Sequence, residues 1–145
     1  MTEARAKALA LPPMVARNED GRGTAFTVSV DAAGATTGVS ARERCETCRV
    51  LADAEAHPSH LVRPGHLFPL VARPGGVLER PGHTEAAVDL CTLAGTAPCG
   101  VLCELRSVDA VDMATREEMA SFVVEHGLSM VTVAALRDHL AALTA

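Results

Sequence analysis

The sequence is poor in aromatic residues, which make up 2% of its 145 positions and include neither tryptophan nor tyrosine. A core must therefore be built from Val, Leu and Ala, which bury less area per residue than aromatic side chains do. Hydrophobic residues still amount to 48% of the chain, enough for one globular core. We expect a single domain over residues 1–145, whose core would gain from oligomerisation.

The sequence also lacks a membrane-spanning run, because no stretch approaches the roughly 20 apolar residues that a membrane helix needs. The N-terminus does not show the basic and then apolar layout of a signal peptide. The net charge is −5 and the basic residues are dispersed, which gives no footprint for nucleic acid or a membrane surface. These absences predict a cytoplasmic protein whose partners include neither nucleic acid nor a membrane.

A disulfide framework is not expected, because the five cysteines are an odd number in a chain with cytoplasmic features. Cys45 and Cys48 lie three residues apart on an expected helix, and such a pair can bind zinc or act as a redox couple. Zinc needs two further ligands, however, and redox pairs usually open a helix. We therefore favour core packing for this pair, and equally for Cys91, Cys99 and Cys103.

The sequence does contain a repeated tetrapeptide. Arg-Pro-Gly-His occurs at Arg63 to His66 and again at Arg80 to His83, and a third Arg-Pro-Gly lies between them at Arg73 to Gly75. Proline fixes one backbone angle and glycine frees the next, so each copy predicts a turn that gives the following histidine a defined direction. Two such turns make His66 and His83 candidates for one site.

Two further features favour a site in this part of the chain. A helix expected to start at about Thr84 favours anions at its N-terminus, and the guanidinium of Arg80 matches phosphate oxygens. Glu104 lies inside an apolar run, where a carboxylate is costly to bury unless it is paired, metal-bound or used in acid/base chemistry. The alternative is that both histidines are surface turn residues and that Glu104 faces solvent on an edge strand.

Capping signals and apolar spacing predict an α/β layered fold, with helices alternating with strands. Ser40 with Glu43, and Thr115 with Glu118, read as capping boxes, while Gly95 and Gly127 follow expected helix ends. The expected helices cover residues 1–10, 41–52, 84–94, 115–127 and 134–143, and the expected strands cover 24–31, 67–72, 100–105 and 128–133.

In several of these segments the sequence resembles the 3,4-dihydroxy-2-butanone 4-phosphate synthase family, a lyase family of the riboflavin pathway. The likeness rests on several multi-residue motifs that occur in the same order. They are Thr24 to Asp31, Thr36 to Ala41, Arg63 to Leu70, Gly75 to Asp89 and Gly100 to Leu105, followed by His126 to Leu128 and Val131 to Val133.

The resemblance implies a mixed sheet with flanking helices and conversion of ribulose 5-phosphate to formate and 3,4-dihydroxy-2-butanone 4-phosphate. It implies a magnesium cofactor, or manganese in its place, and an active site at a homodimer interface. Carried over by motif, Glu104 and His66 are the catalytic residues and His83 is a metal ligand. Substrate and phosphate contacts fall to four further residues, Arg80, Thr84, Thr36 and Thr37.

Family members also carry an N-terminal acidic segment of the Glu-Asp-Arg-Glu-Asn type, which supplies a metal-binding carboxylate and a phosphate-binding arginine. Nothing in this sequence matches it, so the resemblance covers the later part of the family domain. Without that carboxylate, the remaining metal ligands would be substrate oxygens, water, a local acid such as Glu85 or Asp31, or a residue of another chain. We therefore expect a lyase that is impaired or complemented by another chain. The alternatives are a diverged sugar-phosphate enzyme and a non-catalytic phosphate-binding or assembly module.

Overall fold

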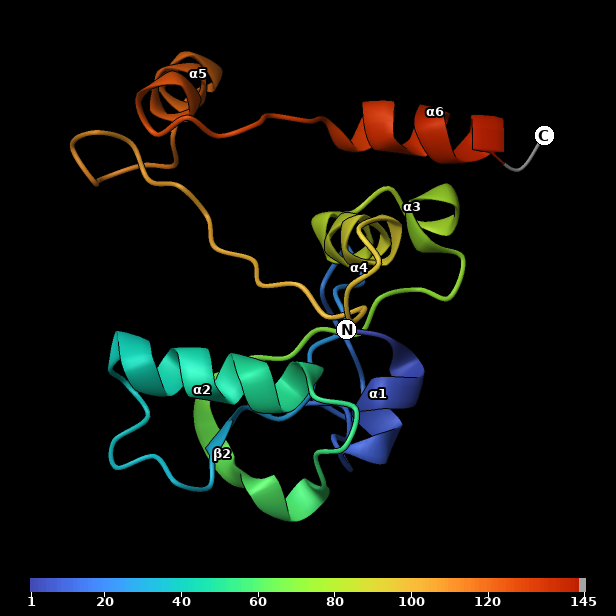
Figure 1. The fold of residues 1–145 in the computed structure, drawn as a ribbon, viewed down its shortest axis with the longest axis vertical. Helices are drawn as coiled ribbons and strands as arrows, with labels where there is room; N and C mark the ends of the chain where they lie inside the picture. Colours follow the sequence, from blue (N-terminus) through green and yellow to red (C-terminus); the bar gives the residue numbers. More distant parts are fainter. Residues whose placement is uncertain (144–145) are drawn as a thin grey trace.

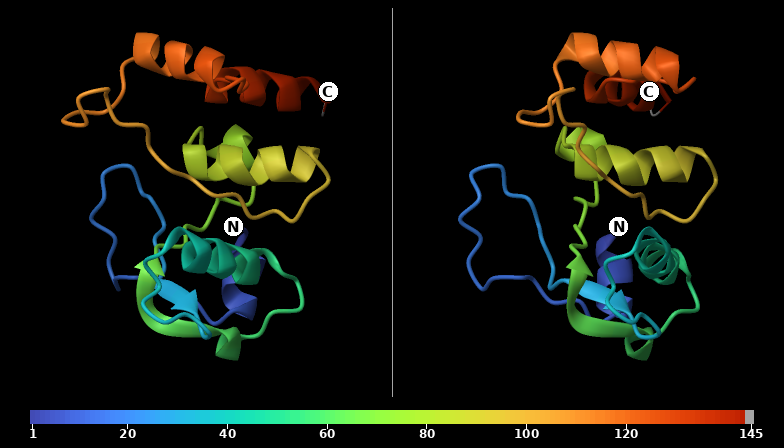
Figure 2. Two further views of the ribbon diagram at one scale, coloured as in Figure 1. Left: turned by 60° about the vertical axis from the view of Figure 1, so that its left-hand side comes forward. Right: turned by 90° about the vertical axis from the view of Figure 1, so that its left-hand side faces the viewer.

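The structure, a computed structural model, describes residues 1–143 and consists of helices around one small antiparallel sheet. Figures 1 and 2 show two groups of elements, one around α1, α2 and β2 and the other around α3, α4 and α6. In chain order the elements are α1 Glu3–Ala8, β1 Val30–Ala32, α2 Ala41–Ala52, the 3-10 helix η1 Pro58–His60, β2 Leu61–Leu67, α3 Gly76–Glu79, α4 His83–Leu93, α5 Arg116–Glu125 and α6 Val133–Leu143. This arrangement confirms the expected class of helices flanking a sheet.

Each group has its own apolar cluster. The first gathers around Leu9, Val30 and Leu51, from the end of α1, from β1 and from α2. The second joins Val77 of α3 to Leu136 of α6, across α4. Aliphatic side chains make up both clusters, as the scarcity of aromatic residues predicts.

The helix boundaries follow the local signals in the sequence. The Ser40 hydroxyl accepts from the Glu43 backbone N–H at the start of α2, and Thr115 and Glu118 form a complete capping box at the start of α5. Gly95 and Gly127 follow α4 and α5 with φ of 68° and 59°, a left-handed conformation that glycine adopts at little cost. These caps confirm the predicted positions of α2, α4 and α5, whereas η1 and α3 were not predicted and α1 is shorter than the expected helix over residues 1–10.

The sheet is interrupted where the first Arg-Pro-Gly-His lies. Asp31 pairs with Val62 and Val30 pairs with Leu67, so one step along β1 faces five steps along β2. The four residues Arg63 to His66 therefore bulge out of a strand, where a free turn had been expected. The bulge is what directs His66, and neighbouring β1 determines that direction.

Two expected strands do not form. Residues 100–105 and 128–132 are extended but unpaired with any strand of the described residues. Their apolar side chains are exposed: Val101 is 72% exposed and Val131 is 56% exposed. A strand requires a neighbouring strand for its row of N–H and C=O groups, and the described residues supply no such strand at these places.

The other two expected strands are shortened. Residues 24–29 make single bridges, Phe26 with Leu70 and Thr27 with Pro13, before β1 begins at Val30. Residues 68–72 follow the end of β2, and the Pro69 carbonyl accepts from the Thr27 backbone N–H at 2.9 Å. Pro69 has no N–H to donate, which limits pairing there.

All five cysteines are free, and the predicted core packing holds in part: Cys99 packs against the first apolar cluster, but none of the five is fully buried. Cys45 and Cys103 are exposed, and the other three are half-buried. Cys45 faces outward because Thr47 and Leu51 occupy the buried face of α2. Across residues 1–143, none of the helices combines the length and the apolar character needed to cross a membrane.

Candidate functional site

A pocket of about 430 Å³ lies between the two groups of elements, and three of the predicted site residues line it. His66 comes from β2, Thr84 from α4 and Glu104 from the segment that follows α4. Apolar side chains, among them Leu51 and Phe68, form much of the remaining wall. The sequence therefore identified residues that the fold does bring to one cavity.

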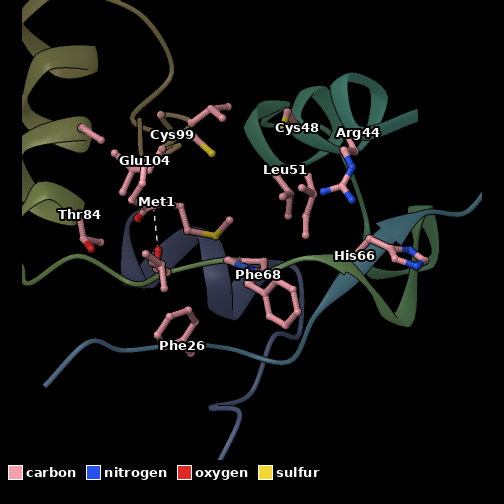
Figure 3. A pocket seen from close by; sticks show the side chains of 17 residues that line it. Met1, Phe26, Arg44, Cys48, Leu51, His66, Phe68, Thr84, Cys99 and Glu104 are labelled. Atoms are coloured by element: carbon pink, nitrogen blue, oxygen red, sulfur yellow. Dashed lines mark hydrogen bonds between the residues drawn. The ribbon is translucent and has the colours of Figure 1, made fainter. Parts of the chain in front are cut away.

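Within this pocket the predicted residues stand at two ends. Figure 3 shows Thr84 and Glu104 on one side of Met1, and His66 with Arg44 on the other. The Met1 amino group donates to the Leu70 carbonyl at 2.9 Å, and burial lowers the pKa of that amine. The pocket thus has a histidine end and a carboxylate end.

Glu104 is exposed on an irregular segment rather than buried in an apolar strand. The apolar residues around it are also exposed, with Leu102 at 42% and Leu105 at 38%. The desolvation argument for Glu104 is therefore wrong for this chain, because water reaches the carboxylate. Its position on the wall of the pocket is what keeps it a candidate.

The second tetrapeptide ends at the N-terminus of α4. Gly82 is the N-cap and His83 is the first helical residue, one position before the predicted start at Thr84. Thr84 is buried, whereas His83 is exposed and lines an adjoining pocket of about 380 Å³. The two pockets share Ala87 and Gly100 among their lining residues, so His83 and Thr84 serve neighbouring cavities.

Arg80 is already engaged by the protein. Its guanidinium lies 2.6 Å from the Glu85 carboxylate and also donates to the Arg22 carbonyl. Glu85 is only 1% exposed, and its other oxygen accepts from the Arg73 backbone N–H at 2.9 Å. This buried ion pair fixes the second tetrapeptide to α4, and it occupies Glu85, which the sequence offered as a substitute metal ligand.

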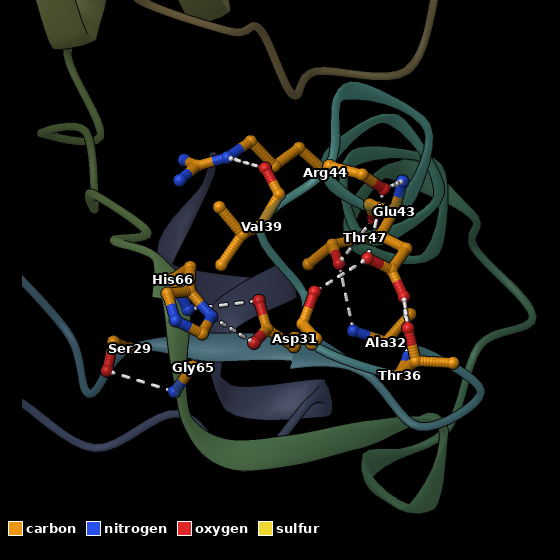
Figure 4. A network of polar contacts seen from close by, with 12 residues as sticks. Ser29, Asp31, Ala32, Thr36, Val39, Glu43, Arg44, Thr47, Gly65 and His66 are labelled. Carbon is orange, nitrogen blue, oxygen red and sulfur yellow. Dashed lines mark hydrogen bonds and ion pairs between the residues drawn. The ribbon is translucent and has the colours of Figure 1, made fainter.

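The first tetrapeptide carries a different contact. His66 Nδ1 lies 2.7 Å from one oxygen of Asp31, and the His66 backbone N–H donates to the other oxygen at 2.9 Å. Figure 4 shows this pair beside the contact between Ser29 and Gly65. Asp31 is 5% exposed. Sequence reasoning considered Asp31 only as a metal ligand and missed its contact with His66, which lies 35 residues away.

Thr36 and Thr37 lie on the loop before α2, where they contact Glu43. Its carboxylate accepts from the Thr36 backbone N–H, from both threonine hydroxyls and from the Ser40 hydroxyl. These hydrogen bonds lower the pKa of Glu43 to about 2, and those from Thr36 have the largest effect. Glu43 thus fixes the loop, a role that the capping-box reading did not include.

Arg44 was also missed. It lines the pocket beside His66, and its Nε donates to the Val39 carbonyl at 2.9 Å. The sequence gives one indication of this position: Arg44 follows the capping residue Glu43 and therefore lies on the first turn of α2.

The described residues do not form a metal site by themselves. No three His, Cys, Asp or Glu side chains among residues 1–143 gather closely enough to hold an ion. Magnesium prefers several oxygen ligands, and His83 offers one nitrogen. Of the acids considered as substitutes, Glu85 is bound to Arg80 and Asp31 is bound to His66.

Comparison with known proteins finds relatives whose names refer to riboflavin biosynthesis. The family model described as 3,4-dihydroxy-2-butanone 4-phosphate synthase matches residues 1–139. A 3,4-dihydroxy-2-butanone 4-phosphate synthase from Chlorobium limicola is 55% identical over 134 residues, 92% of this chain and 60% of that relative. Riboflavin biosynthesis protein RibBA from Nocardia farcinica is 56% identical over 128 residues, 87% of this chain and 31% of that relative. The chain therefore spans less than two thirds of the length of these relatives.

Solved structures agree with this likeness. The crystal structure of 3,4-dihydroxy-2-butanone 4-phosphate synthase from Candida albicans superposes with a TM-score of 0.90 at 42% identity, over 97% of this chain and 69% of that one. A second synthase structure, in complex with two magnesium ions, gives a TM-score of 0.85 at 43% identity, over 97% of this chain and 70% of that one. The arrangement of elements described above is therefore shared with solved members.

Proposed function

Because the chain belongs to the 3,4-dihydroxy-2-butanone 4-phosphate synthase family, we propose that it acts in the lyase reaction of that family. Its substrate is ribulose 5-phosphate and its products are formate and 3,4-dihydroxy-2-butanone 4-phosphate, a step of riboflavin biosynthesis. The observation that carries this proposal is that His66, Thr84 and Glu104 line one pocket, at its two ends. These are residues that the family motifs carry over to this chain.

The phosphate end of the substrate is assigned to the start of α4. The first backbone N–H groups of a helix lack intrahelical acceptors and favour an anion, and Thr84 adds a hydroxyl there. Arg80 lies just before the helix and supplies positive charge, although its guanidinium also serves Glu85. Thr36 and Thr37 border the substrate from the loop that Glu43 holds.

Proton transfers are assigned to Glu104 and His66. An exposed carboxylate on a pocket wall can accept and return a proton, and an imidazole does the same near neutral pH. The two side chains stand at different ends of the pocket, so they serve different reacting atoms of one substrate. In a homodimer, His66 could also reach the active site of the neighbouring subunit.

Magnesium, or manganese in its place, is proposed as the cofactor because a matched synthase structure contains two magnesium ions. The metal would stabilise negative charge on the substrate oxygens. His83 is the ligand that the family motif assigns to this chain. The described residues offer no complete set of ligands around it. We therefore expect weak metal affinity for the 145-residue chain by itself.

We also propose a cytoplasmic homodimer. The exposed apolar residues Val101, Leu102 and Val131 would be covered by a second copy, since exposed apolar surface of this kind favours association. Analytical ultracentrifugation of the purified chain tests this point. A well-behaved monomer at low concentration would contradict it.

The decisive experiment is formate release from ribulose 5-phosphate by the purified chain with magnesium, beside Glu104→Gln and Glu125→Gln variants. Glu125 is exposed at the end of α5 and serves as the matched control. We expect activity that the first variant reduces by about 10²-fold or more and the control leaves unchanged. No formate from a folded sample would overturn the proposal for a chain acting alone, and would favour a complemented lyase or another sugar phosphate.

A further inference from the structure

We propose that Asp31 is a positioning residue for His66, whose ring it holds in the tautomer with the proton on Nδ1. This leaves the Nε2 lone pair as the acceptor of the ring. The tautomer assignment rests on geometry alone. Its consequence for turnover rests on the function proposed above.

Asp31 contacts His66 at two atoms, the ring Nδ1 and the backbone nitrogen. One carboxylate oxygen of Asp31 faces His66 Nδ1 at 2.7 Å, and the other accepts from the His66 backbone N–H at 2.9 Å. An ionised carboxylate is an acceptor only, so the nitrogen facing it must carry a proton. Both oxygens are engaged, and the carboxylate therefore has a fixed orientation (Figure 4).

The backbone around this pair is built closely. A Cβ at Gly65 would lie 2.0 Å from the Val30 carbonyl carbon, so β2 can approach β1 at this point only with glycine there. The Ser29 hydroxyl accepts from the Gly65 N–H at 3.2 Å. On the other side, a Cβ at Gly38 would lie 2.0 Å from an Asp31 carboxylate oxygen. The carboxylate is thus enclosed by the Gly38 loop, with His66 along its open side.

The exposure of the two side chains fits a positioning role. The Asp31 side chain is 8% exposed, while the His66 side chain is 47% exposed on the pocket wall. A buried carboxylate that orients a reachable imidazole is the arrangement by which acid/base histidines are held in one tautomer. If Asp31 served only to fix the backbone, its hydrogen bond from the His66 backbone N–H would be enough.

The chain contains a matched carboxylate without a histidine ring. Asp89 accepts from the Val77 backbone N–H at 2.8 Å and lies against Gly76, as Asp31 lies against Gly38. Gly76 and Gly38 both have positive φ, 58° and 73°. Asp89→Asn is therefore a control that disturbs the same kind of local packing elsewhere in the molecule.

The chain also contains a reference histidine of the opposite tautomer. His60 Nδ1 accepts from the His57 backbone N–H at 3.2 Å, so in its neutral form the proton is on Nε2. Nitrogen-15 NMR distinguishes these two forms from the chemical shifts of the ring nitrogens. One spectrum of the full chain at a pH where both rings are neutral compares the two residues.

Asp31→Asn makes a sharp prediction. The backbone N–H of His66 still needs an acceptor, so the amide oxygen turns to it and the amide NH₂ group faces Nδ1. His66 Nδ1 then becomes an acceptor and its proton moves to Nε2. We expect the ring-nitrogen chemical shifts of His66 to become like those of His60 in Asp31→Asn. They should stay unchanged in Asp89→Asn.

In the activity assay we expect kcat to fall by about 10²-fold in Asp31→Asn with little change in KM. A wild-type spectrum with the proton on Nε2 of His66 overturns the proposal, and this reading does not depend on whether any variant folds. An unchanged tautomer in a folded Asp31→Asn protein also overturns it. If the wild-type chain releases no formate, the proposed function fails while the spectra still decide the role of Asp31.

Discussion

The two copies of Arg-Pro-Gly-His have the same sequence and different structures. In the first, Arg63 to His66 bulges from a strand and its histidine is held by a carboxylate. In the second, Arg80 to His83 joins α3 to α4 and its histidine is exposed on the first turn of a helix. The conformation of each copy therefore depends on its surroundings, because four residues do not determine whether they extend a strand or start a helix.

The arginines differ as much as the histidines. Arg63 donates to three backbone carbonyls, those of Leu9, Leu61 and Pro58. Arg80 forms an ion pair with the buried Glu85. The first copy is thus fixed by neutral groups around its arginine and a carboxylate at its histidine, and the second by a carboxylate at its arginine.

Removing Arg80 should have the largest effect on stability. Arg80→Ala leaves the Glu85 carboxylate buried without its partner, which costs about 3–5 kcal/mol in the free energy of unfolding. Urea denaturation measures this loss. The double variant Arg80→Ala with Glu85→Gln should recover most of it, and a double variant no more stable than the single one would contradict the explanation.

Gly65→Ala should come next, because it acts on the backbone contact of the first copy. The added Cβ would lie 2.0 Å from the Val30 carbonyl carbon, so β1 and β2 must separate. We expect a loss near the upper end of about 1–3 kcal/mol. Gly21→Ala is the control, since a Cβ there meets nothing within 4 Å. Equal stability of the two variants would show that the bulge adjusts freely.

Arg63→Ala should destabilise less than Arg80→Ala. The carbonyls it leaves, led by that of Leu9, are neutral and can bind water once the guanidinium is gone. We expect a loss of about 1–2 kcal/mol by urea denaturation. A larger loss than that of Arg80→Ala would reverse the comparison between the two copies.

Acid should act on the first copy through the loop beside it. The pKa of Glu43 is lowered to about 2 from 4.5, so its stabilisation is present above pH 4.5 and is lost as pH falls toward 2. The difference in thermal midpoint between wild type and Glu43→Gln should therefore shrink over that range. Glu46→Gln on the same helix is the control. A difference independent of pH would show that charge on Glu43 is not involved.

Local signals predicted much of the fold and some of the site. The caps at Ser40 and Thr115 and the glycines after α4 and α5 gave helix positions, since these interactions join residues close in sequence. The site residues came from motifs. Sequence reasoning left open whether Glu104 is buried or faces solvent; the structure exposes it, and the strand that both readings assumed does not form, because the described residues supply no partner strand.

The sequence by itself determined the approximate positions of α2, α4, α5 and α6, the aliphatic character of the core and the candidate residues of the site, but not α3 or η1. Tertiary structure alone decided which apolar runs pair, where the first tetrapeptide bulges and which carboxylate meets which basic group. The physical reason is distance along the chain: a cap links residues three apart, whereas the contact between Asp31 and His66 links residues 35 apart. Contacts of that kind exist only after the elements have packed.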